Sequence, residues 1–428
     1  MSSINIIQWN IHGLRNNYNE LELLIKERNP HIICLQETHC PNQFSPILPK
    51  NYTGYFNNNN LNITAKQGVG LIIKNNIPHK EIYINTHFQV IAIEIVLNIK
   101  FTIISIYLPP SESFSTNDII NILANINGPV FLLGDINSWN TLWGSRCNNS
   151  RGNAFERALI QLDLHILNDG SPTHFSTHGT FTNIDISCCS SSIFPLVTWK
   201  IFDDLHNSDH FPIEINVKTS HNTNRSQSKI IPKFILKNAN WEKFSTCLDK
   251  ELNNKVFTEN SNKSAATFSK AIKTAANISI PQSTYISFSK TPWWNQNLSL
   301  LRQDKMKKWQ DFKQCRSVEN LIAYKKANAT FRKSARKQKY DSFIAFTGQI
   351  NRDSSIKDLW NKVNKLSRRN TSQNIMAINT SNNTLTENID IANHFAIEWS
   401  TYSSNENFSS EFKKESGSIL TYCRPDKK

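Results

Sequence analysis

The first 218 residues predict an α+β layered sandwich rather than a doubly wound parallel sheet. Eight short segments rich in β-branched residues alternate with turn clusters, which is the pattern of strands. Only two helical segments lie between them, at residues 16–28 and 117–126, whereas a doubly wound sheet needs a helix after almost every strand. The segments 89–97 and 101–108 also follow each other closely enough to form an antiparallel hairpin.

The expected helix at 16–28 carries Leu21, Leu24 and Ile25 on one face, so it should pack on a sheet through that face. Asn98 lies near the expected turn of the hairpin. The expected strands are residues 4–9, 31–36, 68–74, 89–97, 101–108, 129–134, 180–187 and 211–217.

The net charge of +14 is unevenly distributed over the 428 residues. Residues 1–218 contain 13 Lys and Arg against 17 Asp and Glu, a balance of −4. Residues 219–428 contain 35 against 17, a balance of +18. A strongly basic half indicates either a nucleic-acid partner or a solvated, Lys-rich helical surface, and charge alone does not decide between them.

Membrane insertion and secretion are not expected. No apolar run approaches the roughly 20 residues that span a bilayer. The N-terminus has neither a basic leader nor a cleavage site. The eight cysteines show no C-x-x-C spacing, and Cys188 and Cys189 are adjacent. These features indicate reduced thiols in an intracellular protein rather than a disulfide framework or a zinc site.

The composition changes after residue 218. Residues 219–229 are rich in Ser and Asn, and from Trp293 onward apolar residues recur at helical spacing with Lys and Arg between them. Residues 367–385 are rich in Asn, Ser and Thr. We therefore expect a domain over 1–218, a linker and irregular connector over 219–290, a basic helical hairpin over 291–366 and a loose segment over 367–428.

Short polar motifs border the expected strands and are the main functional signal. Taken singly, Glu37 could be a surface carboxylate, Asp135 could belong to a turn, and His210 could be structural. Their joint occurrence, in order and at strand ends, is hard to attribute to chance, because loops on a rigid sheet carry catalytic groups. The motifs are Trp9-Asn10, Leu35-Gln36-Glu37-Thr38, Tyr107-Leu108-Pro109-Pro110, Gly134-Asp135-Ile136-Asn137, Thr182-Asn183-Ile184-Asp185 and Ser208-Asp209-His210.

These residue types suit phosphodiester hydrolysis. Mg²⁺ and Mn²⁺ prefer hard oxygen ligands, and a carboxylate such as Glu37 supplies one. The reaction also needs a base that orients or deprotonates water, and a donor that stabilises negative charge on the phosphate.

The motifs resemble those of the endonuclease/exonuclease/phosphatase superfamily, over residues 3–218. The resemblance implies a four-layered α/β sandwich with one divalent metal ion, Mg²⁺ or alternatively Mn²⁺. By this resemblance Glu37 would be the main metal ligand, with Asn10 close to metal and phosphate. Asp135 would orient and deprotonate the attacking water, and Asn137 would help to hold the phosphate.

The same resemblance implies the remaining phosphate contacts. Tyr107 would donate to the phosphate, and His210 would stabilise or protonate it. Asp185 would orient His210, and Asp209 would lie nearer the metal, but the sequence leaves the reverse assignment of these two carboxylates open.

Further residues indicate the branch of the superfamily. Abasic-site repair endonucleases usually carry Asp two residues after the first-strand Asn, whereas this chain has His12, which we interpret as a turn residue rather than a ligand. Thr173 resembles a phosphate-contacting threonine of the retrotransposon branch, and Thr182 is a second candidate contact. The runs Leu142-Trp143-Gly144-Ser145 and Arg151-Gly152 are similar to those of jockey-like non-LTR retrotransposon endonucleases.

The back half carries the same resemblance. Trp293 and Trp294 precede the basic hairpin, as in the segment between endonuclease and reverse transcriptase of these elements, although both could simply pack the hairpin. The run 357–362 is also similar to that region. Because no Tyr-x-Asp-Asp motif occurs, we expect a second open reading frame that is truncated before its reverse transcriptase.

The resemblance implies Mg²⁺-dependent nicking of DNA in the nucleus, leaving a 3′-hydroxyl that primes reverse transcription, with element RNA as a further partner of the basic half. The alternatives are an inactive nucleic-acid-binding remnant, an abasic-site repair endonuclease, and a lipid or inositol-phosphate phosphodiesterase. Loops 138–148 and 188–195 would set target preference. Arg146 and Arg151 could contact the DNA backbone or simply be solvated.

Overall fold

The computed structural model describes residues 3–41, 51–57, 67–97, 99–176, 178–219, 233–253, 260–283 and 292–348, with shorter stretches between 46 and 49 and between 355 and 410. These residues cluster into two compact units. One unit comprises residues 2–220, 312–321 and 350–428, and the other comprises 221–311 and 322–349. The predicted linker 219–229 lies, apart from Thr219, outside the described residues.

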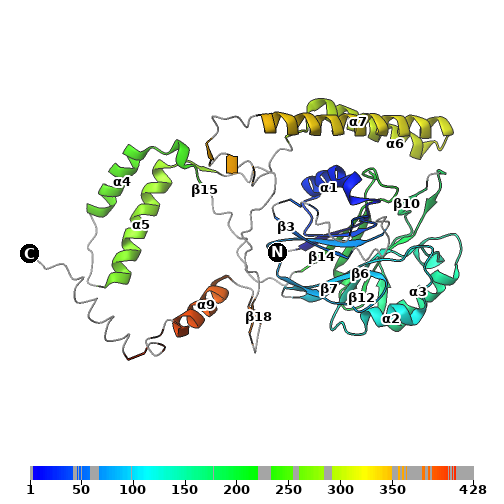
Figure 1. The fold of residues 1–428 in the computed structure, drawn as a ribbon, viewed down its shortest axis with the longest axis horizontal. Helices are drawn as coiled ribbons and strands as arrows, with labels where there is room; N and C mark the ends of the chain where they lie inside the picture. Colours follow the sequence, from blue (N-terminus) through cyan, green and yellow to red (C-terminus); the bar gives the residue numbers. More distant parts are fainter. Residues whose placement is uncertain are drawn as a thin grey trace, which may run out of the picture. The chain divides into compact units, whose positions relative to one another are not determined.

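Two six-stranded sheets form the centre of the first unit (Figure 1). The first sheet has the order β13 (Val197–Ile201), β14 (Ile213–Lys218), β1 (Ser3–Asn10), β2 (Ile32–Gln36), β4 (Val69–Lys74) and β3 (Tyr52–Asn57). The second has the order β5 (His79–Ile82), β6 (Gln89–Val96), β7 (Lys100–Tyr107), β8 (Val130–Asp135), β12 (Asp185–Ser190) and β9 (Leu164–Ile166). The neighbours β1/β2 and β7/β8 are parallel, and the other neighbouring strands are antiparallel.

Helices cover the outer face of each sheet, which gives four layers (Figure 1). Leu21 and Leu24 of α1 (Leu14–Arg28) share an apolar cluster with Trp9 of the first sheet. The helices α2 (Thr116–Leu123) and α3 (Ser150–Gln161) pack in the same way on the second sheet. A further cluster fills the space between the sheets. The predicted α+β, four-layered sandwich is confirmed.

Alternate side chains along β1 contribute both to the hydrophobic core and to the polar edge between the two sheets. Ile6 lies in the cluster between the sheets, whereas Trp9 faces α1. Gln8 is buried on the Ile6 face, where its Nε2 donates to the carbonyl oxygen of Gly134 in the second sheet at 3.2 Å. Asn10 follows on that same face, so the strand delivers a polar side chain to the edge between the two sheets.

Several elements of this unit were missed by the sequence prediction. Helix α3 was not expected, because its buried face is short and includes the small residues Gly152, Ala154 and Ala158. The predicted strand 180–187 divides into β11 (Phe181–Thr182) and β12. The strands β3, β5, β9, β13 and β10 (His174–Phe175) were also not predicted; β10 pairs with β11 over two residues, which is too short for a periodic signal.

The prediction of an irregular connector over 219–290 was wrong. Helices α4 (Trp241–Asn253) and α5 (Ser261–Ser279) lie there, followed by β16 (Gln282–Ser283), which pairs with β15 (Lys233–Phe234). The buried face of α5 consists of alanines, namely Ala271, Ala275 and Ala276. Alanine favours helix but carries little hydrophobic signal, so the polar composition of the segment masked both helices.

The predicted basic hairpin segment contains α6 (Gln296–Gln314) and α7 (Val318–Gly348). The rings of Trp309 and Tyr324 lie 4.7 Å apart and those of Trp294 and Phe331 lie 6.2 Å apart, so the helices run antiparallel and Trp294 packs between them. Within 367–428, predicted to be loose, α9 (Asn388–Tyr402) is helical and β17 (Ile378–Asn379) pairs with β18 (Thr384–Leu385).

None of the helices in the described part of the chain has the length and apolar character needed to cross a membrane. The seven cysteines of these described residues are free thiols.

Gly134→Ala should strongly destabilise the first unit. A Cβ on Gly134 would lie 1.9 Å from the carbonyl oxygen of Ile106 in β7, so the strands would have to separate. We expect a loss of about 2 kcal/mol or more in urea unfolding. Gly348→Ala is the control, because a Cβ there meets nothing within 4 Å. An unchanged midpoint for Gly134→Ala would contradict the close approach.

His31 should make the fold sensitive to acid. Burial and the charge of Lys74 lower the pKa of His31 to about 4, and its Nδ1 accepts from the backbone N–H of Asn5 at 2.9 Å. A lowered pKa gives stability that is present above pH 6.5 and is lost as the pH falls through about 4. Between pH 6.5 and about 4, the melting temperature of His31→Gln should therefore fall less than that of wild type. The control variant His87→Gln, at an exposed side chain, should show the same change of melting temperature with pH as wild type. Equal changes for wild type, His31→Gln and His87→Gln would contradict the role given to His31.

Candidate active site

The predicted motifs meet at one edge of the sandwich. The carboxyl ends of the parallel pairs β1/β2 and β7/β8 lie at this edge. These ends carry Asn10, Glu37, Tyr107 and Asp135. Strand β12 runs antiparallel to β8 and begins at the same edge, with Asp185 opposite Asp135. Strand topology thus brings together residues such as Asn10 and Asp135, which are 125 apart in the chain.

The side-chain amide of Asn10 joins the two sheets at the centre of the site. Its Nδ2 donates to Glu37 Oε1 at 3.0 Å and to Asp135 Oδ2 at 2.9 Å. The residue is fully buried, and its Oδ1 accepts from the backbone N–H of His12 at 3.1 Å. The hydroxyl of Ser208 donates to the carbonyl oxygen of Asn10 at 2.7 Å. One buried amide therefore holds together the two carboxylates expected to serve metal and water.

A buried histidine lies between two buried aspartates. His210 Nδ1 is 2.8 Å from Asp185 Oδ2, and its Nε2 is 3.9 Å from Asp135 Oδ2. Burial lowers the pKa of His210, but the charge of Asp185 and its hydrogen bond outweigh burial and raise the pKa. Burial and the charge of Asp185 also raise the pKa of Asp135 above its usual range. The site therefore combines a cationic imidazole with a carboxyl group of increased basicity.

Glu37 stays ionised although it is mostly buried. Burial raises the pKa of its carboxyl, but hydrogen bonds from His39 and Asn10 outweigh burial and lower the pKa to about 2. Tyr107 also donates to Glu37, and burial together with the nearby carboxylates raises the pKa of its phenol, so the phenol remains protonated. An ionised carboxylate with 15% of its side chain exposed fits a hard divalent cation.

Asp209 lies at the mouth of the site, with 30% of its side chain exposed. Its Oδ1 is 3.4 Å from His12 Nδ1 and 3.9 Å from His210 Nε2, and its Oδ2 is 3.9 Å from His174 Nε2. Asp185 is closer to His210 than Asp209 is, so the geometry favours Asp185 as the carboxylate that orients His210.

Two groups within the described residues have donor atoms close enough together for a metal ion. The first is His174, Asp209 and His210, and the second is Asp135, Asp185 and His210. Neither group includes Glu37, which meets Asp135 through Asn10 instead. The carboxylates at this edge fit a divalent cation by their chemistry, and among them Glu37 is ionised and partly exposed.

Three predicted residues make supporting contacts. The backbone N–H of Asn137 donates to Asp135 Oδ1 at 3.0 Å. Thr173 is fully buried, and its hydroxyl accepts from two backbone N–H groups at the start of β12. The hydroxyl of Thr182 is 2.8 Å from Nδ1 of His174. These contacts connect the strands and loops around the site, and a direct phosphate contact by Thr173 or Thr182 stays a prediction.

Arg151 braces the loops around the site, which the sequence did not indicate. Its guanidinium donates to the backbone carbonyl oxygens of Leu108, Ile136, Asn137 and Glu112. The guanidinium also lies over the ring of Phe114 at 4.7 Å. These bonds join the loop after β7 to the loop after β8, so Arg151 is a structural group here and not a solvated side chain.

Two histidines at the site were also missed. His39 Nε2 lies 3.3 Å from Glu37 Oε2, and the ring of His174 lies 4.5 Å from that of His210. His39 could have been found, since it follows Glu37 by two residues at a strand end. His12 adopts the predicted turn conformation with a φ of 48°, but its ring also reaches the acidic residues.

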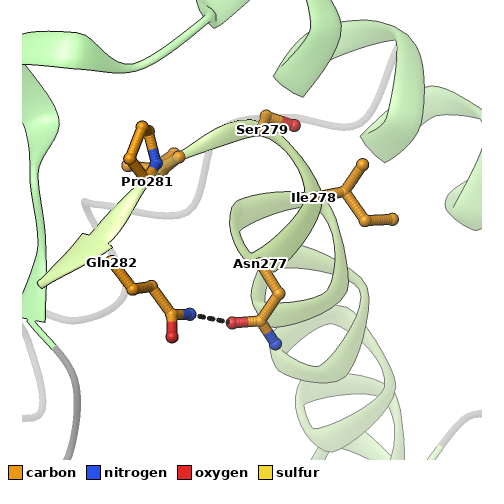
Figure 2. A pocket seen from close by; sticks show the side chains of 6 residues that line it. Asn277, Ile278, Ser279, Pro281 and Gln282 are labelled. Atoms are coloured by element: carbon orange, nitrogen blue, oxygen red, sulfur yellow. Dashed lines mark hydrogen bonds between the residues drawn. The ribbon is translucent and has the colours of Figure 1, made fainter. Parts of the chain in front are cut away.

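A surface hollow in the other unit offers no comparable chemistry (Figure 2). Nε2 of Gln282 donates to Oδ1 of Asn277 at 2.6 Å beside it. Its lining residues are Asn277, Ile278, Ser279, Ile280, Pro281 and Gln282. Because no ionisable side chain lines this hollow, the edge of the sandwich is the candidate active site.

Comparisons with known proteins found a matching family and similar curated proteins. Residues 101–214 match the family described as endonuclease-reverse transcriptase. The probable RNA-directed DNA polymerase from transposon X-element of Drosophila melanogaster is 25% identical over 222 residues, which are 51% of this chain and 24% of that protein. The RNA-directed DNA polymerase from mobile element jockey, also of Drosophila melanogaster, is 24% identical over 179 residues, 41% of this chain and 19% of that protein.

Solved structures give a similar match. The endonuclease domain of TRAS1, a telomere-specific non-LTR retrotransposon, is 21% identical, with a TM-score of 0.44 over 50% of this chain and 98% of that one. The AP endonuclease LMAP from Leishmania major is 12% identical, with a TM-score of 0.43 over 51% of this chain and 89% of that one.

Residues 101–214 of this four-layered sandwich are thus similar to an endonuclease-reverse transcriptase family. More particularly, the chain is similar to the jockey and X-element proteins. The chain spans about a quarter or less of the length of these curated relatives, 24% and 19%.

Arg151→Lys should destabilise the first unit although the charge is kept. A lysine cannot reproduce the planar fork that reaches several carbonyl groups at once, and unsatisfied buried carbonyl groups cost about 1–3 kcal/mol. The urea midpoint should fall accordingly. Arg146→Lys is the matched control, since Arg146 is exposed. If Arg151→Lys weakened DNA binding without any change in stability, the role as a brace would be wrong.

Proposed function

We propose that residues 1–218 form a metal-dependent endonuclease that nicks DNA and leaves a 3′-hydroxyl. The observation that carries the proposal is the amide of Asn10, which holds the carboxylates of Glu37 and Asp135 together beside the His210–Asp185 pair. This arrangement provides a cation ligand, a base and a cationic donor within one buried cluster. Phosphodiester hydrolysis requires these three groups.

Asp135 acts as the base toward the attacking water. Its raised pKa makes the carboxylate a stronger base near neutral pH than an ordinary aspartate. Oδ1 of Asp135 accepts from the backbone N–H of Asn137, which holds the carboxylate in one orientation, while Oδ2 accepts from Asn10. Asp135 therefore presents a fixed oxygen to a water molecule at the mouth.

His210 and Tyr107 act on the phosphate. Asp185 keeps His210 protonated and leaves Nε2 directed toward the Asp135 side of the site, where it donates to the negatively charged phosphate oxygens. Tyr107 stays protonated and turns its donor from Glu37 to the substrate. Asn137 is placed to hold a further phosphate oxygen.

Glu37, with Asn10 beside it, would hold the divalent cation, for which Mg²⁺ or Mn²⁺ fits the oxygen donors. When bound, such an ion supplies Lewis-acid polarisation of the phosphate. The low pKa of Glu37 keeps this carboxylate ready to bind a cation at every physiological pH.

DNA is the substrate class that the relatives suggest. The balance of +18 over residues 219–428 favours a nucleic-acid partner of the basic half, and we assign to it the RNA of the element. In a complete element the nick would prime reverse transcription, which places the reaction in the nucleus. The limits of the endonuclease domain, residues 1–218, and of the basic hairpin, residues 291–366, remain part of this proposal.

Nicking of supercoiled plasmid in Mg²⁺ or Mn²⁺ tests the function. Asp135→Ala and His210→Ala should each lower the rate by about 10²-fold or more, as for other acid–base groups. His87→Ala is the control for His210→Ala, because the His87 side chain is 69% exposed and lies outside the site.

The result separates the competing functions. If wild type nicks no faster than Asp135→Ala, the catalytic proposal fails, and salt-dependent DNA binding without nicking then indicates an inactive remnant. Cleavage confined to abasic plasmid would indicate a repair enzyme, and hydrolysis of a phospholipid head group but not of DNA would indicate a lipid phosphodiesterase.

A further inference from the structure

We propose that the turn of the basic helical hairpin, residues 312–321, is a positioning element of the candidate active site, which it supports through the paired strands β10 and β11. The inference rests on the proposed function, since the site that the turn supports is the one to which that function is assigned. The helical hairpin thereby gains a role in cleavage besides the binding of nucleic acid.

The turn packs on the sandwich through a buried aromatic side chain. Residues 312–321 belong to the same compact unit as the sandwich and join the end of α6 to the start of α7. The ring centroids of Phe312 and Phe175 in β10 lie 5.5 Å apart, and the two residues are only 2% and 7% exposed. Buried rings in edge-to-face contact stabilise each other beyond the area that they bury. The turn is therefore held against β10.

Two charged side chains of the turn add contacts beside this ring pair. The guanidinium of Arg316 lies over the ring of Phe181 in β11, 4.6 Å from its centroid, where the face of the ring attracts a cation. Nζ of Lys313 lies 3.1 Å from Oδ1 of Asp203, in the segment after β13. The turn thus meets both strands of the β10–β11 pair.

The β10–β11 pair needs such support. The two strands pair over only two residues each, and a short two-stranded ribbon is at best marginally stable unless it packs against a helix or another sheet. The end of α6 supplies a packing surface of this kind through Phe312. Loss of that surface should therefore loosen β10 first.

The backbone of β10 is bonded on both sides of His210. The N–H of Phe175 donates to the carbonyl oxygen of Asp209 at 2.7 Å. The N–H of Phe211 donates to the carbonyl oxygen of Thr173 at 2.8 Å. A shift of β10 would therefore be passed to the backbone that carries the imidazole of His210.

The side chains repeat this coupling. His174 and His210 form an antiparallel bridge, and their rings lie 4.5 Å apart. A displacement of about 1 Å in a catalytic group can cost about 10²-fold in rate. Phe312 acts on His210 through Phe175, so it is a positioning residue and not a catalytic one.

Plasmid nicking by the full chain tests the effect on cleavage. Phe312→Ala should lower kcat about 10-fold and leave KM within about 2-fold, because His210 acts on the reacting phosphate and not on DNA affinity. Phe312→Leu keeps an apolar side chain of similar reach and should recover most of the rate. Phe343→Ala is the matched control, since Phe343 of α7 is 51% exposed, and it should equal wild type.

A double-mutant cycle shows whether the effect passes through His210. In the His210→Ala background, Phe312→Ala should have little further effect, because the group that it positions is already absent. An equal loss of rate in both backgrounds would overturn the inference. A faster rate in Phe312→Ala would also overturn it, since the turn would then cover the site rather than support it.

Hydrogen exchange without DNA separates the inference from the proposed function. In Phe312→Ala the amides of Phe175 and Phe211 should exchange at least about 10-fold faster, whereas the amide of Ile6 in β1 should keep its wild-type rate. Unchanged exchange at Phe175 and Phe211 would overturn the inference even if the plasmid is nicked. Faster exchange at both would support it even if wild type nicks nothing, a result that contradicts only the proposed function.

Discussion

The amide of Asn10 is the contact on which the site depends, because it donates to one carboxylate from each sheet. The donor can reach both only if the sheets keep a fixed offset. Buried polar bonds between the sheets maintain that offset: Gln8 donates to the carbonyl of Gly134, and Gln36 donates to the hydroxyl of Ser105 at 3.0 Å. Gln36 directly precedes Glu37, and Gln8 lies two residues before Asn10. The same two strands therefore carry both the hydrogen bonds between the sheets and the polar residues of the site.

Electrostatics explains why the carboxylates of the site differ in how readily they hold a proton. Four acidic side chains close together cannot all be ionised without a cation, since burial opposes each charge. His210 supplies one cation beside Asp185, and hydrogen bonds keep Glu37 ionised. Asp135 receives less compensation and holds its proton more readily. The environment, and not the residue type, thus separates a carboxylate that stays ionised from one that holds its proton more readily.

The strands were predicted from their periodic pattern, and the candidate site residues from the polar motifs at strand ends. Asn10, Glu37 and Asp135 were found because each ends an apolar strand, and the sandwich followed from the same strands. Arg151 could not be found, because its function lies in bonds to the carbonyl groups of loops whose course depends on the finished fold. The helix α5 was missed for a different reason, since its buried face is built from alanines.

The alternation along β1 has a consequence for how the protein responds to a deletion in this strand. Ile6, Gln8 and Asn10 share one face, and Trp9 occupies the other, where its Nε1 donates to the carbonyl oxygen of His210 at 3.1 Å. Deletion of one codon within β1 would exchange the two faces, placing an indole between the sheets and the amide against α1. Loss of the fold and loss of the site would therefore follow from one and the same deletion in this strand.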